Sequence, residues 1–344
     1  MKSPEFWERT DSILPTILAP LGGVYDACAR ARTALTSPQS APVPVVCVGN
    51  AVVGGAGKTP CAMALLSRLR AAGIDAQAIS RGYGGRTTGP HRVDAGSQSA
   101  EEVGDEPLLL ARVAPTWVAR DKAAAARAAA DDGARVVVLD DGLQNPALKK
   151  DLSVLVIDSS VGIGNGRVIP AGPLREPLTR ALDRGHAAIV LDGTGAGQTG
   201  GWPEMIGRLH EKMPVHCARL VPTATALSLL ERPVLAFAGL GHPAKFFSLL
   251  HGMGCDLVGT IAFPDHHRYT PEDIMGVVEA AAAGRARPVT TAKDAVRLPE
   301  DARVMVDVIE VIVEFQDESG IDRLLQPVVQ AAADQTGTPG TCLS

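Results

Sequence analysis

The sequence lacks the features that mark membrane-spanning, disulfide-rich and broadly nucleic-acid-binding proteins. No apolar run reaches the roughly 18 residues of a spanning helix, and the longest candidate, residues 13–24, contains Pro15 and Pro20. The six cysteines form no C-x-x-C pair and no secretory signal is recognisable, so neither a disulfide framework nor a zinc site is expected and a reducing cytoplasm fits best. A net charge of -5 argues against a general basic surface for nucleic acid.

The composition instead indicates a large α/β chain. Its 344 residues are 46% hydrophobic and include 36 glycines, so the chain can bury a sizeable core. Strand-like runs alternate with helical stretches between residues 43 and 221, which predicts a doubly wound, mostly parallel sheet with helices on both faces. We expect strands at 43–48, 76–80, 116–119, 135–139, 153–157, 187–191 and 215–220, and helices at 61–72, 107–113, 122–132, 178–184 and 203–212.

A second, shorter series of strands and helices begins at Pro233. It is expected to contain helices near 244–251, at 271–283 and at 321–333, with a closing strand at 304–313. This pattern predicts a smaller C-terminal α/β domain.

The N-terminal segment carries apolar residues at roughly helical spacing from Phe6 to Tyr25, followed by Arg30 and Arg32. Two interpretations are open. A terminal helix docked on its own protein would have this pattern, and so would an amphipathic helix that lies in a membrane interface.

The stretch V-C-V-G-N-A-V-V-G-G-A-G-K-T-P, residues 46–60, reads as a buried strand, a glycine-rich turn and a helix start. Backbone N–H groups of such a turn bind phosphate oxygens, while Lys58 can reach the terminal phosphates and the Thr59 hydroxyl can bind Mg²⁺. Val52 stands where the strict pattern has glycine, so a glycine-rich turn with a chance lysine is the alternative. Pro60 occupies the third glycine position of a dinucleotide motif, which disfavours that motif.

Acidic residues follow two other predicted elements. In R-V-V-V-L-D-D-G-L-Q-N a strand delivers Asp140 and Asp141 to its carboxyl end, where carboxylates can hold Mg²⁺, although D-D-G alone is often only a turn. In G-D-E-P-L-L-L, Asp105 precedes a helix. It can cap that helix, or act as the proton acceptor that a kinase needs for a sugar hydroxyl, and the two roles are compatible.

Two further loops carry candidate groups. F-P-D-H-H-R-Y contains His266 and His267, which are either structural or able to assist a carboxylate of the first domain on cleft closure. G-N-G-R-V-I-P-A-G-P-L-R-E-P is too rich in proline and glycine for regular structure, so Arg167, Arg175 and Glu176 lie on a loop suited to phosphate or Mg²⁺, unless they are merely solvated. The loops at 80–85 and 119–122 can bring Arg81, Tyr83 and Arg120 to the same edge.

Together with T-A-K-D-A-V-R-L, these motifs resemble, in order from residue 44 to 298, the tetraacyldisaccharide 4'-kinase family of lipid A biosynthesis. The resemblance implies transfer of the ATP γ-phosphoryl group to the 4'-hydroxyl of a tetraacylated glucosamine disaccharide 1-phosphate, at the cytoplasmic face of the bacterial inner membrane. It also favours the interface interpretation of the N-terminal helix, because a substrate with four acyl chains stays in the bilayer.

The resemblance assigns roles to particular residues. Asp105 would be the base, assisted by a histidine of the D-H-H loop, with His266 favoured over His267, and Lys58 would act on the transferred phosphate. ATP would be held by Gly54, Gly55, Ala56, Gly57, Lys58, Thr59 and Arg120, Mg²⁺ by Thr59, Asp140, Asp141 and Glu176, and the lipid substrate by Asn50, Arg81, Tyr83, Gln144, Arg167 and Arg175.

The implied organisation has four parts. A membrane-interface helical segment covers 1–35, a P-loop nucleotide-binding kinase domain 36–225, the smaller C-terminal domain 226–333 and a flexible tail 334–344. No obligate protein partner is evident, and no nucleic acid is expected.

The sequence departs from the family pattern at four positions. Leu143 and Asn145 replace the aromatic residue and the histidine of D-D-G-F-Q-H, Ala56 stands where threonine is common, and Ala292 replaces the glutamate of T-E-K-D.

Two other functions remain as alternatives. The first is a P-loop ATPase or GTPase of another class, such as a cofactor ligase or a metal-insertion GTPase, although no N-K-x-D motif for guanine is present. The second is a nucleotide-binding regulator without turnover, which would not need a base such as Asp105.

Overall fold

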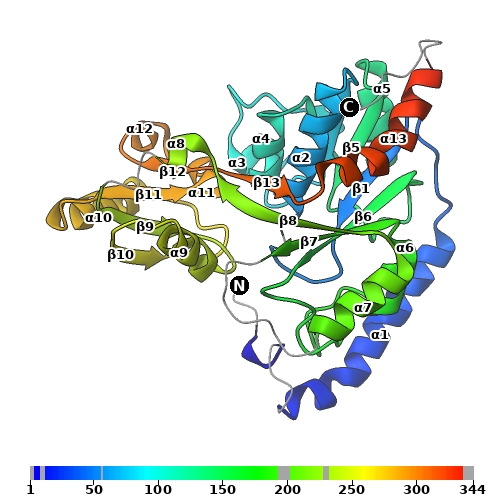
Figure 1. Ribbon diagram of the computed structural model, residues 1–344, viewed down its shortest axis with the longest axis horizontal. Coiled ribbons are helices and arrows are strands. Elements are labelled where there is room, and N and C mark those ends of the chain that lie inside the picture. The colour runs from blue at the N-terminus through cyan, green and yellow to red at the C-terminus, as the bar shows by residue number, and fades with distance from the viewer. Residues whose placement is uncertain (1–3, 8–11, 56, 193–201, 228–231, 336–344) are drawn as a thin grey trace.

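The computed structural model describes residues 4–7, 12–55, 57–192, 202–227 and 232–335, which form two sheets of unequal size (Figure 1). The larger sheet has nine described strands in the order β13-β8-β7-β6-β1-β5-β2-β4-β3, and the smaller has four in the order β10-β9-β11-β12. Strands β1 to β8 are Val45–Gly49, Ala76–Ser80, His91–Arg92, Thr116–Val118, Val136–Asp140, Leu152–Asp158, Ala187–Asp192 and Val215–Pro222, and strands β9 to β13 are Val234–Ala238, Leu257–Ala262, Arg287–Thr291, Asp307–Ile309 and Val311–Phe315.

Seven neighbouring strands of the larger sheet, β8 to β4 in spatial order, run parallel, and antiparallel strands lie at both edges. The predicted doubly wound fold is therefore confirmed. The helices are α1 Leu14–Leu35, α2 Lys58–Ala71, α3 Ala100–Val103, α4 Asp105–Ala111, α5 Lys122–Asp131, α6 Leu178–Arg184, α7 Trp202–Lys212, α8 Ala224–Leu227, α9 Pro243–Gly252, α10 Pro271–Ala283, α11 Ala292–Ala295, α12 Glu300–Arg303 and α13 Glu318–Asp334.

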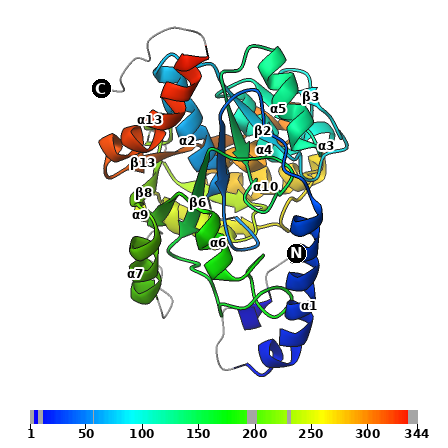
Figure 2. The same cartoon turned by 90° about the vertical axis from the view of Figure 1, so that its right-hand side faces the viewer.

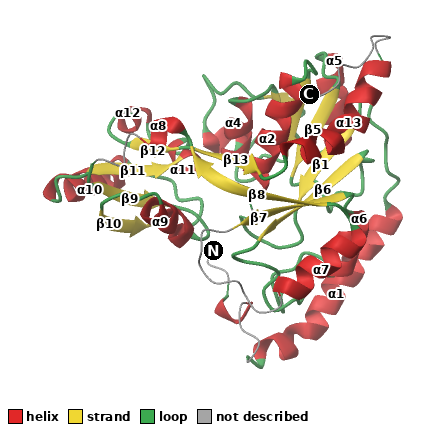
Figure 3. Cartoon of the chain, viewed as in Figure 1, coloured by secondary structure: helices red, strands yellow, loops and turns green. Residues whose placement is uncertain are grey.

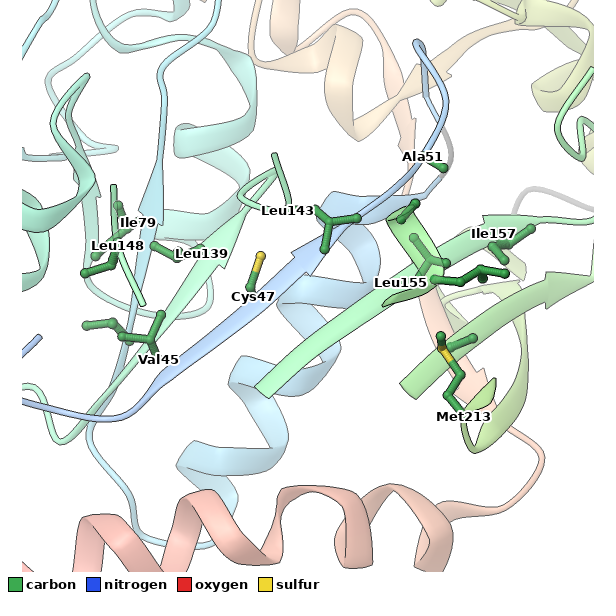
Figure 4. Close-up of a cluster of buried hydrophobic side chains, with 14 of the residues drawn as sticks. Val45, Cys47, Ala51, Ile79, Leu139, Leu143, Leu148, Leu155, Ile157 and Met213 are labelled. Atoms are coloured by element: carbon green, nitrogen blue, oxygen red, sulfur yellow. The ribbon is translucent and has the colours of Figure 1, made fainter. Parts of the chain in front are cut away.

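Strand β1 explains why both faces of the larger sheet are covered. Val45 and Cys47 belong to a cluster that packs against α5, α6 and α7 (Figure 4), whereas Val46 and Val48 belong to a second cluster under α2 and α13. Since every residue of β1 is buried, its continuous apolar run is the pattern of a strand covered on both faces.

Strand β1 also marks the point where the order of the strands in the sheet reverses. It lies between β5 and β6, and the chain builds β2 on the β5 side and β6, β7 and β8 on the other. In open α/β sheets, ligands bind outside the carboxyl ends of the strands at such a switch point. The glycine-rich loop after Gly49 starts at this position.

The smaller sheet is joined to the larger one by β8 and β13, which pair antiparallel where the chain leaves and returns (Figure 3). The predicted strand at 304–313 is wrong, because this stretch contains two strands in different sheets: β12 pairs with β11 and β13 pairs with β8. Helix α13 packs on the larger sheet rather than the smaller. The predicted C-terminal domain, residues 226–333, stays a prediction. Its last two elements, β13 and α13, lie on the larger sheet.

Helix α1 lies along the outside of the larger unit (Figure 2). It begins at Leu14, and Phe6 and Trp7 lie in a separate 3-10 turn, Glu5–Trp7, so the expectation of one helical pattern from Phe6 is wrong at its start. The Arg180 guanidinium donates to both carboxylate oxygens of Asp26 at 2.7 and 3.0 Å and fastens α1 to α6. No described helix combines the length and apolar character needed to cross a bilayer.

Candidate active site

The glycine-rich loop ends in a left-handed turn that starts α2. Gly57 has φ 75°, and a Cβ there would lie 2.2 Å from Leu191 Cδ1, so glycine is required for both backbone and packing reasons. No described side chain caps α2, which leaves the amides of its first turn for an anion. Lys58, the first helical residue, points back over the loop, with Nζ 3.3 Å from the carbonyl oxygen of Gly54.

The two carboxylates expected from D-D-G lie beside this loop, at the end of β5. Asp140 Oδ2 accepts a 2.8 Å hydrogen bond from Thr59 Oγ1, while Oδ1 is buried without a hydrogen-bond partner among the described residues. Burial raises the pKa of Asp140 to about 6. Burial also acts on Asp141, but the cations of Lys58 and Arg175 outweigh it and lower the pKa of this carboxyl.

The proline-rich loop that carries Arg175 and Glu176 is tied to the glycine-rich loop. The backbone N–H of Val53 donates to the Pro173 carbonyl at 2.8 Å, and that of Arg175 donates to the Ala51 carbonyl at 2.7 Å. Arg175 Nη1 lies 2.6 Å from Asp141 Oδ1. The restricted loop therefore delivers a guanidinium to Asp141 and the glycine-rich loop, and its role in binding phosphate stays a prediction.

Glu176 is buried next to the same loop, but its contacts are with protein groups. Its Oε1 accepts from Gln144 Nε2 at 3.2 Å, and its Oε2 lies 3.2 Å from Arg184 Nε. Gln144 also donates to the Asn50 carbonyl at 2.9 Å. The assignment of Glu176 to the metal stays a prediction.

The donor set fits a magnesium ion that is shared with a phosphate. The hydroxyl of Thr59 and the carboxylates of Asp140 and Asp141 are hard oxygen ligands, and Oδ1 of Asp140 is an unused acceptor. No group of three or more His, Cys, Asp or Glu side chains in the described part of the chain forms a metal cage. Magnesium is commonly held by one or two carboxylates together with phosphate oxygens and water, so this arrangement suits it.

A second cluster contains the expected base. Asp105 is the first residue of α4, follows the N-cap Gly104, and is 5% exposed. Its Oδ2 lies 2.8 Å from His266 Nδ1 and 3.3 Å from Arg297 Nε. Asp105 is therefore not the cap of its helix, and its carboxylate faces the D-H-H loop of the smaller unit.

The two histidines of this loop have different surroundings. His266 has φ 55°, and its backbone N–H donates to the Gly239 carbonyl at 3.1 Å. His267 points elsewhere: its Nε2 lies 2.9 Å from Asp273 Oδ2 and its ring stacks on Phe263 with centroids 4.8 Å apart. The geometry places His266 beside the candidate base Asp105 and gives His267 a structural contact.

Glu106 lies between the candidate base Asp105 and the charged groups of the glycine-rich loop region, Lys58 and Asp140. It contributes to the electrostatic environment of both Lys58 and Asp140, and its Oε1 accepts a 2.7 Å hydrogen bond from Lys293 Nζ. Burial lowers the pKa of Lys58, an effect that Asp141 partly offsets. The phosphate loop, the carboxylate pair and the candidate base thus share one edge of the sheet.

The remaining predicted residues that the structure describes differ in exposure. Tyr83 is 68% exposed, and its ring lies 5.5 Å from the His266 ring. Asn50 is fully buried, and neither polar atom of its side chain has a partner among the described residues. Ala56 lies outside the described residues, and the other three, Arg81, Arg120 and Arg167, are exposed.

The structure brings in two buried cations that the sequence reasoning did not select. Lys122 is 3% exposed, its Nζ has no hydrogen-bond partner in the described structure, and burial lowers its pKa to about 8 while Asp140 and Asp141 act in the opposite direction. Arg297 contacts Asp105. Lys122 closes the predicted 119–122 loop and Arg297 belongs to T-A-K-D-A-V-R-L, so both motifs were visible, but nothing local showed which side chain turns inward.

Two of the departures from the family pattern are accommodated by packing. Leu143 is 1% exposed, and its Cβ would be only 2.5 Å from a Cβ on Gly49. Asn145 Oδ1 accepts a 2.8 Å hydrogen bond from the Ala147 N–H. Leucine therefore fills the aromatic position, and asparagine serves the turn that follows.

A phosphate-binding loop at the switch point, two carboxylates at the neighbouring strand end and an aspartate–histidine pair on the same edge define a P-loop-type phosphotransferase. The family described as LpxK, tetraacyldisaccharide-1-P 4'-kinase, matches residues 14–330. The chain belongs to this family, and the resemblance drawn from the motifs is confirmed.

Individual relatives agree with this membership. The tetraacyldisaccharide 4'-kinase of Rhodospirillum centenum is 50% identical over 97% of this chain and 98% of its own length. That of Methylorubrum populi is 49% identical over 96% of this chain and 100% of its own length. A crystal structure described as the "apo" form of LpxK from Aquifex aeolicus in complex with ATP superposes with a TM-score of 0.70 at 27% identity, covering 92% of this chain and 99% of that one.

Proposed function

We propose that this chain is an ATP-dependent lipid kinase that phosphorylates the 4'-hydroxyl of a tetraacyldisaccharide 1-phosphate. The observation that carries the proposal is the 2.8 Å contact between Asp105 and His266 on the edge that also holds Lys58 and the glycine-rich loop. A regulator that only binds nucleotide has no use for a buried carboxylate held in this way, which favours catalysis.

The residues divide the work of phosphoryl transfer. The amides of the glycine-rich loop and of the first turn of α2 bind the ATP phosphates, and Lys58 and Arg175 neutralise charge on the transferred group. Thr59 and Asp140 would hold the metal ion, with Asp141 beside them. When bound, Mg²⁺ supplies charge neutralisation and orientation of the phosphates. Since such transfer depends mainly on positioning and charge stabilisation, this set is sufficient.

Asp105 acts as the general base. As the acceptor oxygen bonds to the γ-phosphorus, the bond from that phosphorus to the bridging oxygen of ADP breaks, and the hydroxyl proton passes to the Asp105 carboxylate. His266 holds the carboxylate through Nδ1. We assign four exposed side chains to binding of nucleotide or of the phosphorylated disaccharide: Tyr83, Arg81, Arg120 and Arg167.

Helix α1 brings the enzyme to its substrate. Its outer face exposes Leu14, Ile17, Leu21 and Val24, of which Ile17 is 62% exposed and Val24 61% exposed. Leaving these side chains in water has a cost that a membrane interface removes. We therefore place the enzyme at the cytoplasmic face of the bacterial inner membrane, bound peripherally through α1.

Label transfer from γ-labelled ATP to lipid-dispersed disaccharide 1-phosphate tests the proposal. Wild type should label the lipid, and Asp105→Asn should lose about 10²-fold or more in kcat while it still binds ATP. Asp301→Asn, an exposed position in α12, is the matched control and should keep the wild-type rate. Absence of label in the lipid with folded wild type overturns the kinase assignment, and a full rate in Asp105→Asn overturns the base assignment alone.

A further inference from the structure

The guanidinium of Arg297 is the second group that holds the candidate base. Arg297 follows α11 in the smaller unit and is 4% exposed at its side chain. Its Nε lies 3.3 Å from Asp105 Oδ2, the same oxygen that contacts His266. No described residue forms a hydrogen bond with the other oxygen of Asp105, Oδ1. This oxygen is also not one of the fully buried side-chain atoms that lack a hydrogen-bond partner.

Arg297 is itself held rigidly by the smaller unit. Its Nε donates to the Lys293 carbonyl at 3.2 Å, so the contact of this nitrogen with Asp105 is an ion pair and not a hydrogen bond. Its Nη2 donates to the Gly239 carbonyl at 3.1 Å and to Asp294 Oδ1 at 2.9 Å, and its Nη1 donates to the His267 carbonyl at 3.1 Å. These acceptors include the backbone of the D-H-H loop. One planar group therefore connects the base, the loop that carries His266, and the strand end at Gly239.

Asp294, the ion-pair partner of Arg297, has hydrogen bonds to both of its carboxylate oxygens. Asp294 is fully buried, and its Oδ1 accepts hydrogen bonds from the Gly239 N–H at 2.8 Å and from Tyr269 Oη at 2.7 Å, while Thr291 Oγ1 donates to its Oδ2 at 2.6 Å. A buried ion pair with this many hydrogen bonds keeps a single geometry. The position of the guanidinium is thus set by the smaller unit and not by Asp105.

We propose that Arg297 is a positioning residue for the kinase reaction, which, together with His266, holds Oδ2 of Asp105 so that Oδ1 is the oxygen that receives the hydroxyl proton. The inference rests on the proposed role of Asp105 as base. It also makes that base dependent on both sheets, because the carboxylate comes from α4 and both of its partners come from the smaller unit. A smaller unit that is displaced leaves the carboxylate unoriented.

The cation has a second consequence for the reaction. Its positive charge attracts the Asp105 carboxylate and keeps Oδ2 at the smaller unit, so removing the charge should free the carboxylate to turn. Other charged or titratable groups near Asp105 are His266, Asp265 at 3.9 Å from His266 Nε2, and the Lys293–Glu106 pair. These groups remain in the variants below, so the comparison isolates Arg297.

Three variants separate positioning from a purely structural role. Arg297→Met removes the charge, and we expect kcat to fall about 10- to 100-fold, with little change in KM for ATP. Arg297→Lys keeps the cation but not the fork, so we expect it to restore part of the lost rate, with a kcat above that of Arg297→Met and about tenfold below wild type. Arg287→Met is the control: it removes a surface ion pair with Asp307 in the smaller sheet and should keep the wild-type kcat and KM.

The possible results are distinguishable. A folded Arg297→Met enzyme with wild-type kcat contradicts the proposal, as does one whose loss lies only in KM for ATP, and so does a folded Arg297→Lys enzyme with wild-type kcat. If Arg297→Met does not fold, the lysine variant decides alone. Asp105→Asn is measured in parallel: if it keeps a full rate, the base assignment fails and Arg297 has nothing to position, whereas if it is inactive and the Arg297 variants are normal, only the role of Arg297 fails.

Discussion

Thr59 and Asp140 are joined by a 2.8 Å hydrogen bond from Oγ1 to Oδ2, although they come from different elements, α2 and β5. The bond connects the residue after the loop lysine to the carboxylate at the end of the adjoining strand, which is the pairing that a magnesium ion next to phosphate requires. The same carboxylate is buried, so the site is arranged for a cation at a cost to the protein without ligand.

The first prediction concerns that cost. Burial raises the pKa of Asp140 to about 6. The folded protein therefore binds a proton at this carboxyl more tightly than the unfolded chain does. The stability that this group contributes is present below about pH 4 and is lost as the pH rises through about 6. Asp140→Asn should therefore raise the melting temperature of the nucleotide-free protein at pH 7.5, by a few degrees for on the order of 1–2 kcal/mol.

The same variant should lose activity. With one of the carboxylates for magnesium removed, we expect kcat to fall about 10²-fold, and magnesium-ATP to stabilise the variant much less than wild type. Scanning calorimetry with and without magnesium-ATP measures both effects. A lower melting temperature without ligand would show that the ionised carboxylate stabilises the fold, contrary to this account.

The second prediction uses Lys122. Because burial lowers its pKa to about 8, the unfolded chain binds more protons than the folded protein between about pH 8 and 10. The free energy of unfolding should therefore increase over this range, by on the order of 2 kcal/mol, and the gain should disappear in Lys122→Met. Urea titrations at several pH values measure it, with Lys149→Met, an exposed position, as the control. An equal gain in both variants assigns the effect to other groups.

The sequence predicts features of the fold and the site that depend on residues close together in the chain, and it misses features that depend on residues far apart. The loop between β1 and α2 could be predicted because its glycines, lysine and threonine act locally, next to a strand and a helix that their own apolar patterns define. Asp140 and Asp141 follow from the same reasoning, since parallel strands place their carboxyl ends at one edge. Their pairing with Thr59 and Arg175 is the consequence.

The features that the sequence did not predict depend on distant partners. Residues 304–313 are mostly apolar, interrupted by Asp307 and Glu310, and only the pairing of Val311–Phe315 with β8 separates them into two strands of different sheets. Strands β10 and β11 were missed in the same unit. Arg297 contacts Asp105 across two sheets, and no local pattern distinguishes it from a surface arginine such as Arg303.

The third prediction tests the preference for His266 over the neighbouring His267. His266→Ala removes the contact to Asp105 and should lower kcat about 10- to 100-fold with little effect on stability, since the side chain is partly exposed. His267→Ala removes the contact to Asp273 and the stacking on Phe263, so it should lower stability by about 1–2 kcal/mol and keep kcat within about threefold. Steady-state kinetics and thermal melts of both variants check this, and the reverse pattern would assign the base partner to His267.

The last prediction concerns helix α1 and the membrane. Ile17 and Leu21 lie on its exposed face, at 62% and 56% exposure, while Gly22 on the opposite face is buried against the carbonyl of Val168. Burying one such aliphatic side chain in an interface contributes roughly 1.5 kcal/mol or more, so Ile17→Glu with Leu21→Glu should weaken binding to anionic phospholipid vesicles at least about 100-fold. Because neither side chain packs on the protein, the melting temperature and the kcat on detergent-dispersed substrate should stay near wild type. Val304→Glu, at a position 87% exposed on the smaller unit, introduces the same charge away from α1 and should leave vesicle binding unchanged. Equal vesicle binding by wild type and the double variant in a sedimentation assay would mean that a different surface meets the bilayer.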